Sequence, residues 1–275
     1  MRKVNVMDFK GTRALVTGAS SGIGEVFAHE LAARGANLVL TARSTAKLEA
    51  LAAKLRKAGV LVDIVAMDLS APAAGAALAA ELASRGLEID VLINNAGFGL
   101  FAPLNDTDPK QITQQVYLNV VTPTELTRAL LPGMLSRDRG AIVNVASTVA
   151  FQPVPYMSVY GGTKAYVLSF TEALWAETRG TNVRVMALCP GATDTAFFDA
   201  ASDNASLGQR MAPQAVVAAA FKGLDRRRST VIPGLGNRLQ AKLPRLLSRQ
   251  SVARITERIM RPKPTTSPHP AAQES

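Results

Sequence analysis

Short apolar runs alternate along the chain with longer stretches in which apolar residues recur at helical spacing. The short runs are nearly continuous, which is typical of parallel strands that are buried on both faces. Their alternation with helices predicts an α/β fold with a doubly wound parallel sheet of about seven strands and helices on both faces. We expect strands at 13–18, 37–42, 61–69, 90–97, 140–147, 182–191 and 229–234, and helices at 22–34, 46–58, 71–85, within 109–137, 157–179 and 213–227.

The same pattern predicts one domain followed by two C-terminal segments. No internal linker rich in Pro, Gly or Ser precedes residue 262, so residues 1–233 are expected to form a single domain. Residues 234–262 interleave Leu, Ile and Val with Arg and Lys, which predicts a basic amphipathic helical extension that Pro244 breaks or kinks. Residues 263–275 are rich in proline and poor in apolar residues, and we expect a disordered tail there.

Composition excludes several classes of protein. Hydrophobic residues make up 48% of the 275 residues, which is enough for a large core and excludes a disordered chain. Cys189 is the single cysteine, so no intramolecular disulfide can form, and this suits a reducing compartment. The N-terminus has no apolar stretch typical of a signal peptide, and no run of about 18 apolar residues predicts a spanning helix. These features together predict a cytoplasmic protein.

The net charge of +10 is concentrated near the C-terminus. Residues 1–225 hold 20 Lys/Arg and 19 Asp/Glu, whereas residues 226–263 hold 11 Lys/Arg and one acid, Glu257. Three interpretations of the basic 234–262 segment compete. It packs its apolar side on the body or on a neighbouring subunit, it lies peripherally on an anionic membrane surface, or it contacts nucleic acid. The body offers no matching basic face, so we expect no nucleic-acid partner.

A glycine-rich loop, TGASSGIG, joins the first predicted strand to the first predicted helix. Its three glycines carry no Cβ where the turn is tight and where a pyrophosphate must approach the backbone. The N-terminus of the following helix adds free N–H groups and the positive end of the helix dipole. The spacing Gly-x-x-x-Gly-x-Gly differs from that of most dinucleotide folds, and an ordinary Gly/Ser turn is the alternative. The residues expected to hold the pyrophosphate are Gly18, Ser20, Ser21, Gly22, Ile23 and Gly24.

The sequence YGGTK places Tyr160 and Lys164 four residues apart, on one face of a predicted helix. A free phenol has a pKa near ~10, and a neighbouring ammonium group favours the phenolate and lowers that pKa. Ser147 ends a predicted parallel strand, which is where open α/β sheets bind their ligands. Its hydroxyl could hydrogen-bond a substrate carbonyl. Each of these residues alone is weak support for a site, because similar residues are common on ordinary helices and strand ends.

Together these segments make the chain resemble the short-chain dehydrogenase/reductase family, in its compact single-domain branch. Within that family it is most similar to bacterial reductases of the ketoacyl and hydroxysteroid type, whose substrates are broad or undefined. The resemblance covers residues 12–234 and implies that residues 1–233 are a Rossmann-type catalytic domain. It is carried, in family order, by TGASSGIG (17–24), NNAG (94–97), YLNVV (117–121), NVAST (144–148), YGGTK (160–164) and PGATDT (190–195).

The resemblance implies four catalytic residues and no metal. Tyr160 would donate a proton to the developing alkoxide, and Lys164 would lower the pKa of Tyr160 and hold the nicotinamide ribose. Ser147, thirteen residues before the tyrosine as the family pattern expects, would orient the carbonyl. Asn119 would hold a water beside Lys164 in a proton relay. The hydride would come from the nicotinamide, so the protein supplies position and a proton.

The residues after the second strand favour NADP(H) over NAD(H). An acidic residue there would bind the adenosine 2′-hydroxyl, but this chain has Arg43, which could pair with a 2′-phosphate. The alternative is a solvated surface arginine. The resemblance also implies that Asp68 and Leu69 meet the adenine. It places Asn95, Ala96 and Gly97 on the nicotinamide side, where Pro190, Gly191, Thr193 and Thr195 close over the carboxamide.

The loops that flank the predicted site are rich in aromatic residues, which predicts an apolar pocket for a hydrophobic ketone or aldehyde. Core packing or a subunit interface is the alternative explanation for each ring. The expected activity is NADPH-dependent reduction of such a carbonyl. The alternatives are an NADP-dependent alcohol or hydroxysteroid dehydrogenase working oxidatively, and a non-catalytic protein that senses NADP. The residues expected to line the pocket are Phe98, Leu100, Phe101, Phe151, Tyr156, Phe197 and Phe198, with Arg210 the only obvious cation there.

The resemblance also implies a homodimer or homotetramer, because the helices containing 113–131 and 158–178 usually pair across subunits in the family. The two glycines of YGGTK, Gly161 and Gly162, have two explanations. They allow the helix to pack closely against the cofactor or a partner helix, which we favour, or they are merely tolerated.

Overall fold

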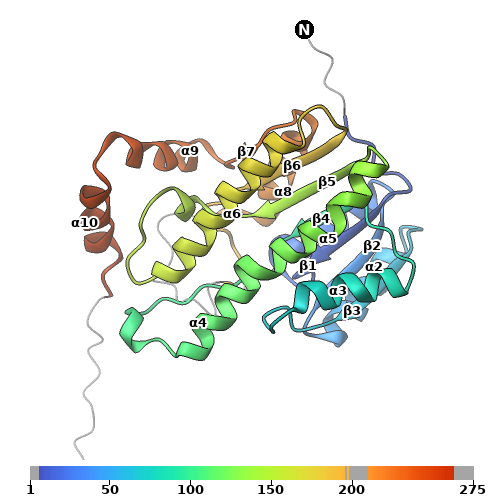
Figure 1. The fold of residues 1–275 in the computed structure, drawn as a ribbon, viewed down its shortest axis with the longest axis horizontal. Helices are drawn as coiled ribbons and strands as arrows, with labels where there is room; N and C mark the ends of the chain where they lie inside the picture. Colours follow the sequence, from blue (N-terminus) through green and yellow to red (C-terminus); the bar gives the residue numbers. More distant parts are fainter. Residues whose placement is uncertain (1–5, 196, 198–209, 263–275) are drawn as a thin grey trace, which may run out of the picture.

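The computed structural model describes residues 6–195, 197 and 210–262 of the chain. Its centre is a sheet of seven parallel strands in the order β3-β2-β1-β4-β5-β6-β7 (Figure 1). The predicted doubly wound sheet is therefore confirmed. The strands are β1 (Arg13–Thr17), β2 (Asn37–Ala42), β3 (Val62–Ala66), β4 (Val91–Asn94), β5 (Gly140–Val145), β6 (Val183–Leu188) and β7 (Thr230–Val231).

Helices cover both faces of this sheet. On one face α1, α2 and α8 enclose a core that contains Phe27, Leu48 and Phe221, and on the other α3, α5 and α6 enclose a core that contains Leu78 and Leu126. The helices of the body are α1 (Gly22–Ala33), α2 (Thr45–Arg56), α3 (Ala74–Ser84), α4 (Pro109–Val116), α5 (Thr122–Ser136), α6 (Ser158–Glu177) and α8 (Pro213–Asp225), with 3₁₀ turns η1 (Leu104–Asp106) and η3 (Thr148–Phe151).

Burial on both faces explains the continuous apolar runs in the strands. Along β1, Leu15 belongs to one core while Ala14 and Val16 belong to the other, and all three are fully buried. Strand β1 pairs with β2 on one side and with β4 on the other. The strand order reverses there, and in open α/β sheets the ligand crevice lies at the carboxyl ends of the strands at this point.

Several strands end earlier than the apolar runs predicted. The run 90–97 forms a strand only over Val91–Asn94, and the run 61–69 only over Val62–Ala66. The predicted 229–234 strand is limited to Thr230–Val231. In the first two runs, residues beyond the strand end leave the ladder and line the crevice. Apolar character alone does not separate a strand from the apolar loop that follows it.

The long predicted helix within 109–137 is divided in the structure. A π-helical segment, η2 (Tyr117–Val121), lies between α4 and α5. Such segments are rare and often occur at functional sites. Here the segment contains Asn119, which is 1% exposed and points toward the crevice loop at Phe98.

The C-terminal part of the described chain forms a helical arm beyond the β7 edge of the sheet (Figure 1). It consists of α9 (Leu235–Lys242), the 3₁₀ turn η5 (Leu243–Leu246) and α10 (Arg249–Met260). Val252, Thr256 and Met260, four residues apart, form the buried face of α10. The expected tail 263–275 lies outside the described residues. Within the described ranges, no helix has both the length and the apolar character needed to cross a membrane.

Candidate active site

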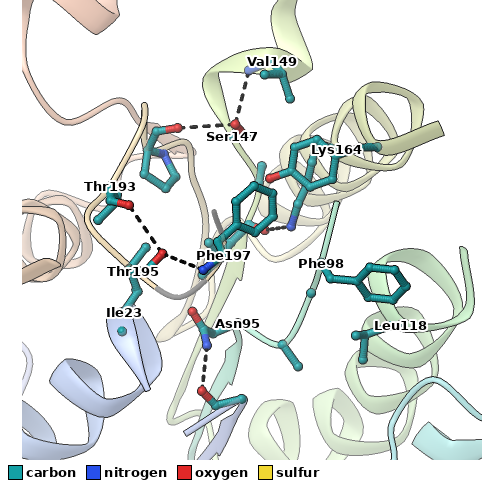
Figure 2. A pocket seen from close by; sticks show the side chains of 18 of the residues that line it. Ile23, Asn95, Phe98, Leu118, Ser147, Val149, Lys164, Thr193, Thr195 and Phe197 are labelled. Carbon is teal, nitrogen blue, oxygen red and sulfur yellow. Dashed lines mark hydrogen bonds between the residues drawn. The ribbon is translucent and has the colours of Figure 1, made fainter. Parts of the chain in front are cut away.

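A cavity of about 840 Å³ lies at the carboxyl ends of the central strands. All the catalytic and cofactor-binding residues predicted from the sequence line it, except Gly24 and Asn119. Figure 2 shows how Ser147, Thr193, Thr195 and Phe197 surround it. The predicted residues that line the cavity are Gly18, Ser20, Ser21, Gly22, Ile23, Arg43, Asp68, Leu69, Asn95, Ala96, Gly97, Ser147, Tyr160, Lys164, Pro190, Gly191, Thr193 and Thr195.

The glycines of the 17–24 loop form a tight cradle at one end of the cavity. Gly18 and Gly22 have positive φ angles of 65° and 59°, which other L residues rarely adopt. A Cβ at Gly18 would lie 2.9 Å from the Cα of Ala96. No side chain caps the N-terminus of α1 at Ser21, so the helix presents its first turn to the cavity. This cradle fits a pyrophosphate.

Gly24 and Asn95 fasten this loop to the adjacent strand. Gly24 faces away from the cavity, and a Cβ there would meet the carbonyl oxygen of Gly18 and the side-chain amide of Asn95. Asn95 Nδ2 donates to the carbonyl oxygens of Thr17 and Gly18, at 3.0 and 3.2 Å. The Thr17 hydroxyl accepts hydrogen bonds from the N–H groups of Asn95 and Ala96, at 2.9 and 3.0 Å. Thr17 was not singled out as a site residue from the sequence, and its role there is to hold the cradle.

The opposite wall of this end carries positive charge. Arg43 is exposed and follows β2, and Lys47 from α2 also lines the cavity beside it. Sequence reasoning missed Lys47, although it lies one helical turn after Arg43. Asp68 accepts hydrogen bonds from the N–H and hydroxyl of Ser70, at 3.0 and 2.7 Å. These bonds, and to a smaller extent the charge of Arg43, lower the pKa of Asp68.

Ser147 and the 190–195 segment form the wall at the ends of β5 and β6. The Ser147 hydroxyl accepts from the N–H of Val149 at 3.3 Å and donates to the Pro190 carbonyl at 3.4 Å. The Thr193 hydroxyl donates to the Gly191 carbonyl at 3.0 Å, which folds this segment back on itself. Ser147 and Thr195 follow the ends of β5 and β6, and both line the cavity.

Tyr160 and Lys164 are both buried, at 8% and 5% exposure, and they share one face of α6. Lys164 Nζ donates to the carbonyl oxygen of Val145 at 2.7 Å and lies 5.7 Å from the centre of the Tyr160 ring. Ser147 and Tyr160 both line the cavity. The ring of Phe197 packs on Tyr160 with ring centres 5.3 Å apart. Ser147, Tyr160 and Lys164, which the sequence predicted to form one site, therefore line the same cavity.

The expected lowering of the Tyr160 pKa by Lys164 is wrong for this structure. Burial raises the pKa of Tyr160 well above its usual value, and the hydrogen bond from Ser147 opposes this rise only in part. Burial also lowers the pKa of Lys164 to about 8. Desolvation disfavours the charged form of both groups, so each pKa moves toward the neutral form.

Asn119 lies behind the cavity wall. Its side chain accepts from the N–H of Phe98 at 3.2 Å and donates to the Phe98 carbonyl at 3.0 Å and to the Thr163 hydroxyl at 3.1 Å. A Cβ at Gly97 would lie 3.0 Å from Asn119 Oδ1 and 3.5 Å from Lys164 Nζ, so both polar groups border the space beside Gly97. Asn119 therefore fixes the loop at Phe98, and its Oδ1 faces the same space beside Gly97 as Lys164 Nζ.

The other end of the cavity is apolar, but only some of the predicted rings line it. Phe98, Leu100 and Phe197 do, together with Leu118, Val149, Val154 and Met157. The other three described side chains of the set pack elsewhere. Phe101 and Tyr156 pack on each other with ring centres 6.1 Å apart, and Phe151 packs beside a core cluster that contains Leu168. Phe198 lies outside the described residues. Arg210 is described but does not line the cavity.

Sequence reasoning missed the contribution of the C-terminal arm to this cavity. Asn237 and Gln240 from α9 and Thr256 and Met260 from α10 all line it. A Cβ at Gly191 would lie 2.5 Å from Asn237 Oδ1, so α9 packs directly on the 190–195 segment. Thr256 and Met260 are four residues apart and lie on one face of α10. No pattern in the sequence indicates what this face packs on.

The two glycines after Tyr160 do not pack closely within the chain. A Cβ at Gly161 would make ordinary contact with Val154 at 3.7 Å, and a Cβ at Gly162 would have nothing within 4 Å among the described residues. Neither glycine lines the cavity, so close packing against a cofactor does not explain them. In the described part of the chain, no group of His, Cys, Asp and Glu side chains could hold a metal ion.

Comparison with known proteins agrees with this fold. The family described as "short chain dehydrogenase" matches residues 12–206. The human 17-beta-hydroxysteroid dehydrogenase type 3 is 36% identical over 190 residues, which are 68% of this chain and 61% of that protein. The very-long-chain 3-oxoacyl-CoA reductase of Phaeosphaeria nodorum is 36% identical over 181 residues, which are 64% of this chain and 53% of that protein. The chain thus spans less than two thirds of either relative.

A solved structure is similar over nearly its whole length. It is the short-chain dehydrogenase from Sphingobium yanoikuyae in complex with NADPH, with 35% identity and a TM-score of 0.77. The match covers 94% of this chain and 99% of that one. The chain belongs to the short-chain dehydrogenase family. The sequence-based identification of this oxidoreductase family is confirmed.

Proposed function

We propose that the protein is an NADPH-dependent oxidoreductase that reduces the carbonyl group of an apolar ketone or aldehyde to an alcohol. The main support for this proposal is that a single cavity combines three kinds of residues. A glycine cradle and two cations lie at one end, apolar side chains lie at the other, and Ser147, Tyr160 and Lys164 line it as well. A phosphate-bearing cofactor and an apolar substrate could therefore meet beside a proton donor.

The cofactor fit supports NADP(H). Arg43 and Lys47 lie on the wall near the cradle, and neither forms a salt bridge with an acid in the described part of the chain. Two cations could bind an adenosine 2′-phosphate, and no acid takes the place of Arg43 at the end of β2. The related structure from Sphingobium yanoikuyae contains NADPH. When bound, the reduced nicotinamide supplies the hydride.

The chain's own residues would supply the proton and the orientation. The Tyr160 hydroxyl donates its proton to the carbonyl oxygen as negative charge develops there, and the Ser147 hydroxyl hydrogen-bonds the same oxygen. Burial makes Tyr160 a weak acid, so it keeps its proton until a strongly basic alkoxide forms. Lys164, held by the Val145 carbonyl, provides positive charge near the phenol and would hydrogen-bond the ribose of a bound cofactor. Asn119 holds the Phe98 loop and would hold a water beside Lys164 in a proton relay, because its Oδ1 and Lys164 Nζ border the same space beside Gly97.

The apolar end favours a hydrophobic substrate. Phe98, Leu100, Val149, Val154 and Met157 line it. The two relatives named above are a hydroxysteroid dehydrogenase and a very-long-chain 3-oxoacyl-CoA reductase, and both names denote substrates with a large apolar part, a steroid or a very long acyl chain. Oxidation of an NADP-linked alcohol or hydroxysteroid is the alternative direction at the same site. A non-catalytic NADP sensor is disfavoured, because it would have no need of Tyr160 and Lys164 together.

Self-association, membrane contact and cellular location remain predictions. We propose that α5 and α6 pair with a second copy in a homodimer or homotetramer. In support, Gly162 has open space above it and Tyr166, one turn later on α6, is 41% exposed. A cytoplasmic position at the inner face of a membrane, with contact through residues 234–262, is proposed on the basis of the basic arm.

The experiment that tests this function follows nicotinamide absorbance with NADPH and NADH in parallel, across a series of apolar ketones, aldehydes and β-keto esters. Tyr160→Phe is the matched variant, because it keeps the buried ring and removes the proton donor. We expect turnover with NADPH that falls by about 10²-fold or more in the variant, in line with the contribution of a general acid. Tight NADPH binding without turnover on any substrate would contradict the reductase and favour the sensor.

A further inference from the structure

The C-terminal arm, residues 235–260, has an inner and an outer face. The inner face carries the residues that reach the cavity and the body, among them Asn237, Ala241, Val252 and Met260. The outer face is apolar as well, which is unusual for a segment that already has a buried side. Of the thirteen large hydrophobic residues exposed in the described chain, seven lie in this arm: Leu235, Leu239, Leu243, Leu246, Leu247, Ile255 and Ile259.

The leucines of the first half of the arm form one stripe. Leu235, Leu239 and Leu243 are four residues apart, so they lie on one side of α9 and its continuation. They are 80%, 63% and 51% exposed, and Leu246 is 80% exposed at the end of the stripe. Single exposed leucines are normal, but a row of them marks a surface that binds something apolar.

Positive charges border this stripe. The arm and the residue after it hold seven Arg or Lys and one acid, Glu257. Glu257 is already engaged, because it pairs with Arg261 and accepts from the Tyr156 hydroxyl. No salt bridge joins Lys242, Arg245, Arg249, Arg254 or Arg258 to an acid among the residues that the structure describes.

We propose that the outer face of the arm binds the surface of an anionic lipid bilayer, with the leucines at the level of the acyl chains and the cations among the headgroups. Leucines flanked by basic residues on a surface helix are the pattern of segments that lie in the membrane interface. An anionic surface complements the unpaired charge, whereas a second copy would bring an equally basic arm. The body, which is nearly neutral, adds little to this attraction.

Vesicle binding of the full chain tests this proposal. Sedimentation is measured with phosphatidylcholine vesicles and with vesicles that contain phosphatidylglycerol as well, at low and high salt. We expect stronger binding to the anionic vesicles, weakened by salt. The variant Lys242→Gln/Arg254→Gln should bind them about thirtyfold more weakly, because each cation near an anionic surface contributes about 1 kcal/mol and 1.4 kcal/mol is tenfold. The control Lys54→Gln/Lys57→Gln removes two exposed cations from the end of α2 and should bind like the wild type.

Leu239→Ser/Leu246→Ser tests the apolar part of the surface, with Leu61→Ser/Leu104→Ser as its control. Leu61 and Leu104 are exposed to similar extents, 65% and 56%, but lie outside the arm. Only the first variant should lose vesicle binding.

Equal binding by arm and control variants, or no binding by the wild type, would overturn the proposal. Light scattering gives the molar mass in parallel. An arm variant that changes the mass and leaves vesicle binding unchanged would assign the face to a second copy instead.

The inner face of α10 supports a second inference. It is based on other residues than the first and rests on the proposed function. Met260 is 4% exposed, lines the cavity and packs in one cluster with Val154, Met157 and Tyr160. The hydrogen bond from the Tyr156 hydroxyl to Glu257, at 3.0 Å, fixes α10 against the loop that precedes α6. The family match ends at residue 206, so these residues lie in a part of the chain outside it.

We infer that Met260 determines which substrates the cavity accepts. Its side chain forms part of the apolar wall in the same cluster as Tyr160, so its volume limits the group attached to the carbonyl. Met260→Ala should enlarge the wall and favour bulky ketones over small ones, and Met260→Phe should do the reverse. Ile259→Ala is the matched control, because Ile259 is the preceding residue of α10 but is 57% exposed.

The test compares kcat/KM for a series of ketones of increasing size, with NADPH affinity as an independent readout. For Met260→Ala we expect the ratio of bulky to small substrate to rise about tenfold, at unchanged NADPH affinity. A ratio equal to that of the wild type and of Ile259→Ala would overturn the inference. Failure of the proposed function is distinguishable, because the wild type itself would then turn over no ketone.

Discussion

At the scale of single residues, desolvation decides the electrostatics of the site. Tyr160 and Lys164 are one helical turn apart, and attraction between phenolate and ammonium alone would favour both charges. Burial instead raises the pKa of Tyr160 and lowers that of Lys164 to about 8. Each pKa moves toward the neutral form because a charge loses its hydration when it is buried. The protein without nucleotide therefore holds a protonated phenol beside an amine that titrates near neutral pH.

The lowered pKa of Lys164 predicts how stability depends on pH. At a pH below about 8 the buried ammonium is present in the folded protein and destabilises it. Between about 8 and the ordinary value of 10.5, the unfolded chain binds more protons than the folded one, so the free energy of unfolding rises with pH. The slope from this group is at most about 1.4 kcal/mol per pH unit.

Lys164→Met should remove this rise. Urea unfolding of wild type and variant, without nucleotide, from about pH 7.5 to pH 10, measures the difference between them, in which other titrating groups cancel. The variant is expected to be more stable at the lower pH and to lose that advantage as the pH increases. A difference that stays constant over this range would show that Lys164 is not desolvated as described.

Arg43 is the residue whose replacement should change cofactor choice. It is exposed and lines the cavity near the cradle, without an ion pair to any acid in the ranges that the structure describes. Arg43→Asp would replace attraction to a 2′-phosphate by repulsion, and an acid at this position suits a free 2′-hydroxyl. We expect NADPH binding to weaken by about tenfold or more and NADH binding to change little, measured by fluorescence titration. Equal weakening of both would refute the assignment of Arg43.

At the scale of elements, the site depends on how tightly α1 approaches β1 and β4. Gly24 on α1 faces the Gly18 carbonyl, and Asn95 after β4 donates to the carbonyls of Thr17 and Gly18. These contacts close the turn between strand and helix and thereby aim the N-terminus of α1 at the cavity. A side chain at residue 24 has no space.

Gly24→Ala tests this close approach against helix propensity. Alanine in a helix is favoured over glycine by about 1 kcal/mol, but here its Cβ would meet the Gly18 carbonyl. We expect the clash to prevail and to destabilise the protein by about 1–3 kcal/mol in denaturant unfolding. Gly162→Ala on α6 is the control, because its Cβ has nothing within 4 Å in the described chain, and it should stabilise by up to about 1 kcal/mol. Two variants of equal stability would contradict the packing argument.

At the scale of the whole molecule, the outer face of α5 and α6 is the predicted contact with a second copy. Gly162 is exposed there and leaves room for a facing helix, while Tyr166 stacks on Phe170 with ring centres 5.8 Å apart. The C-terminal arm also covers part of α6, because a second hollow is lined by Ala165 and Leu168 together with Arg245 and Leu247 of the arm. We therefore expect one surface of α6 to contact a second copy and the other to contact the C-terminal arm.

Gly162→Leu should disturb self-association and leave cofactor binding intact. The leucine side chain would occupy the open space above Gly162, which does not line the cavity. We expect a smaller molar mass by light scattering and an NADPH affinity equal to that of the wild type, with Gly162→Ala keeping the wild-type mass. An unchanged mass for the leucine variant would mean that this face is not the interface.

Much of the fold and of the cofactor half of the site could be predicted from the sequence, because both depend on local patterns. Buried parallel strands require continuous apolar runs, and these runs gave the seven strands. Pyrophosphate binding requires glycines between a strand and a helix, as in residues 17–24. The strand ends were less predictable, since the expected strand 90–97 included Asn95, Ala96 and Gly97, which leave the sheet and line the cavity.

The sequence by itself therefore determined the doubly wound sheet, the family and the group of Ser147, Tyr160 and Lys164. Helical spacing fixes the relation of Tyr160 to Lys164, and the parallel strand before Ser147 ends at the same edge. Only the tertiary structure decided that burial reverses the expected pKa shift of Tyr160, and that Met260, a hundred residues later in the chain, packs beside it. Desolvation and long-range packing depend on which distant segments cover a residue, and no local pattern records that.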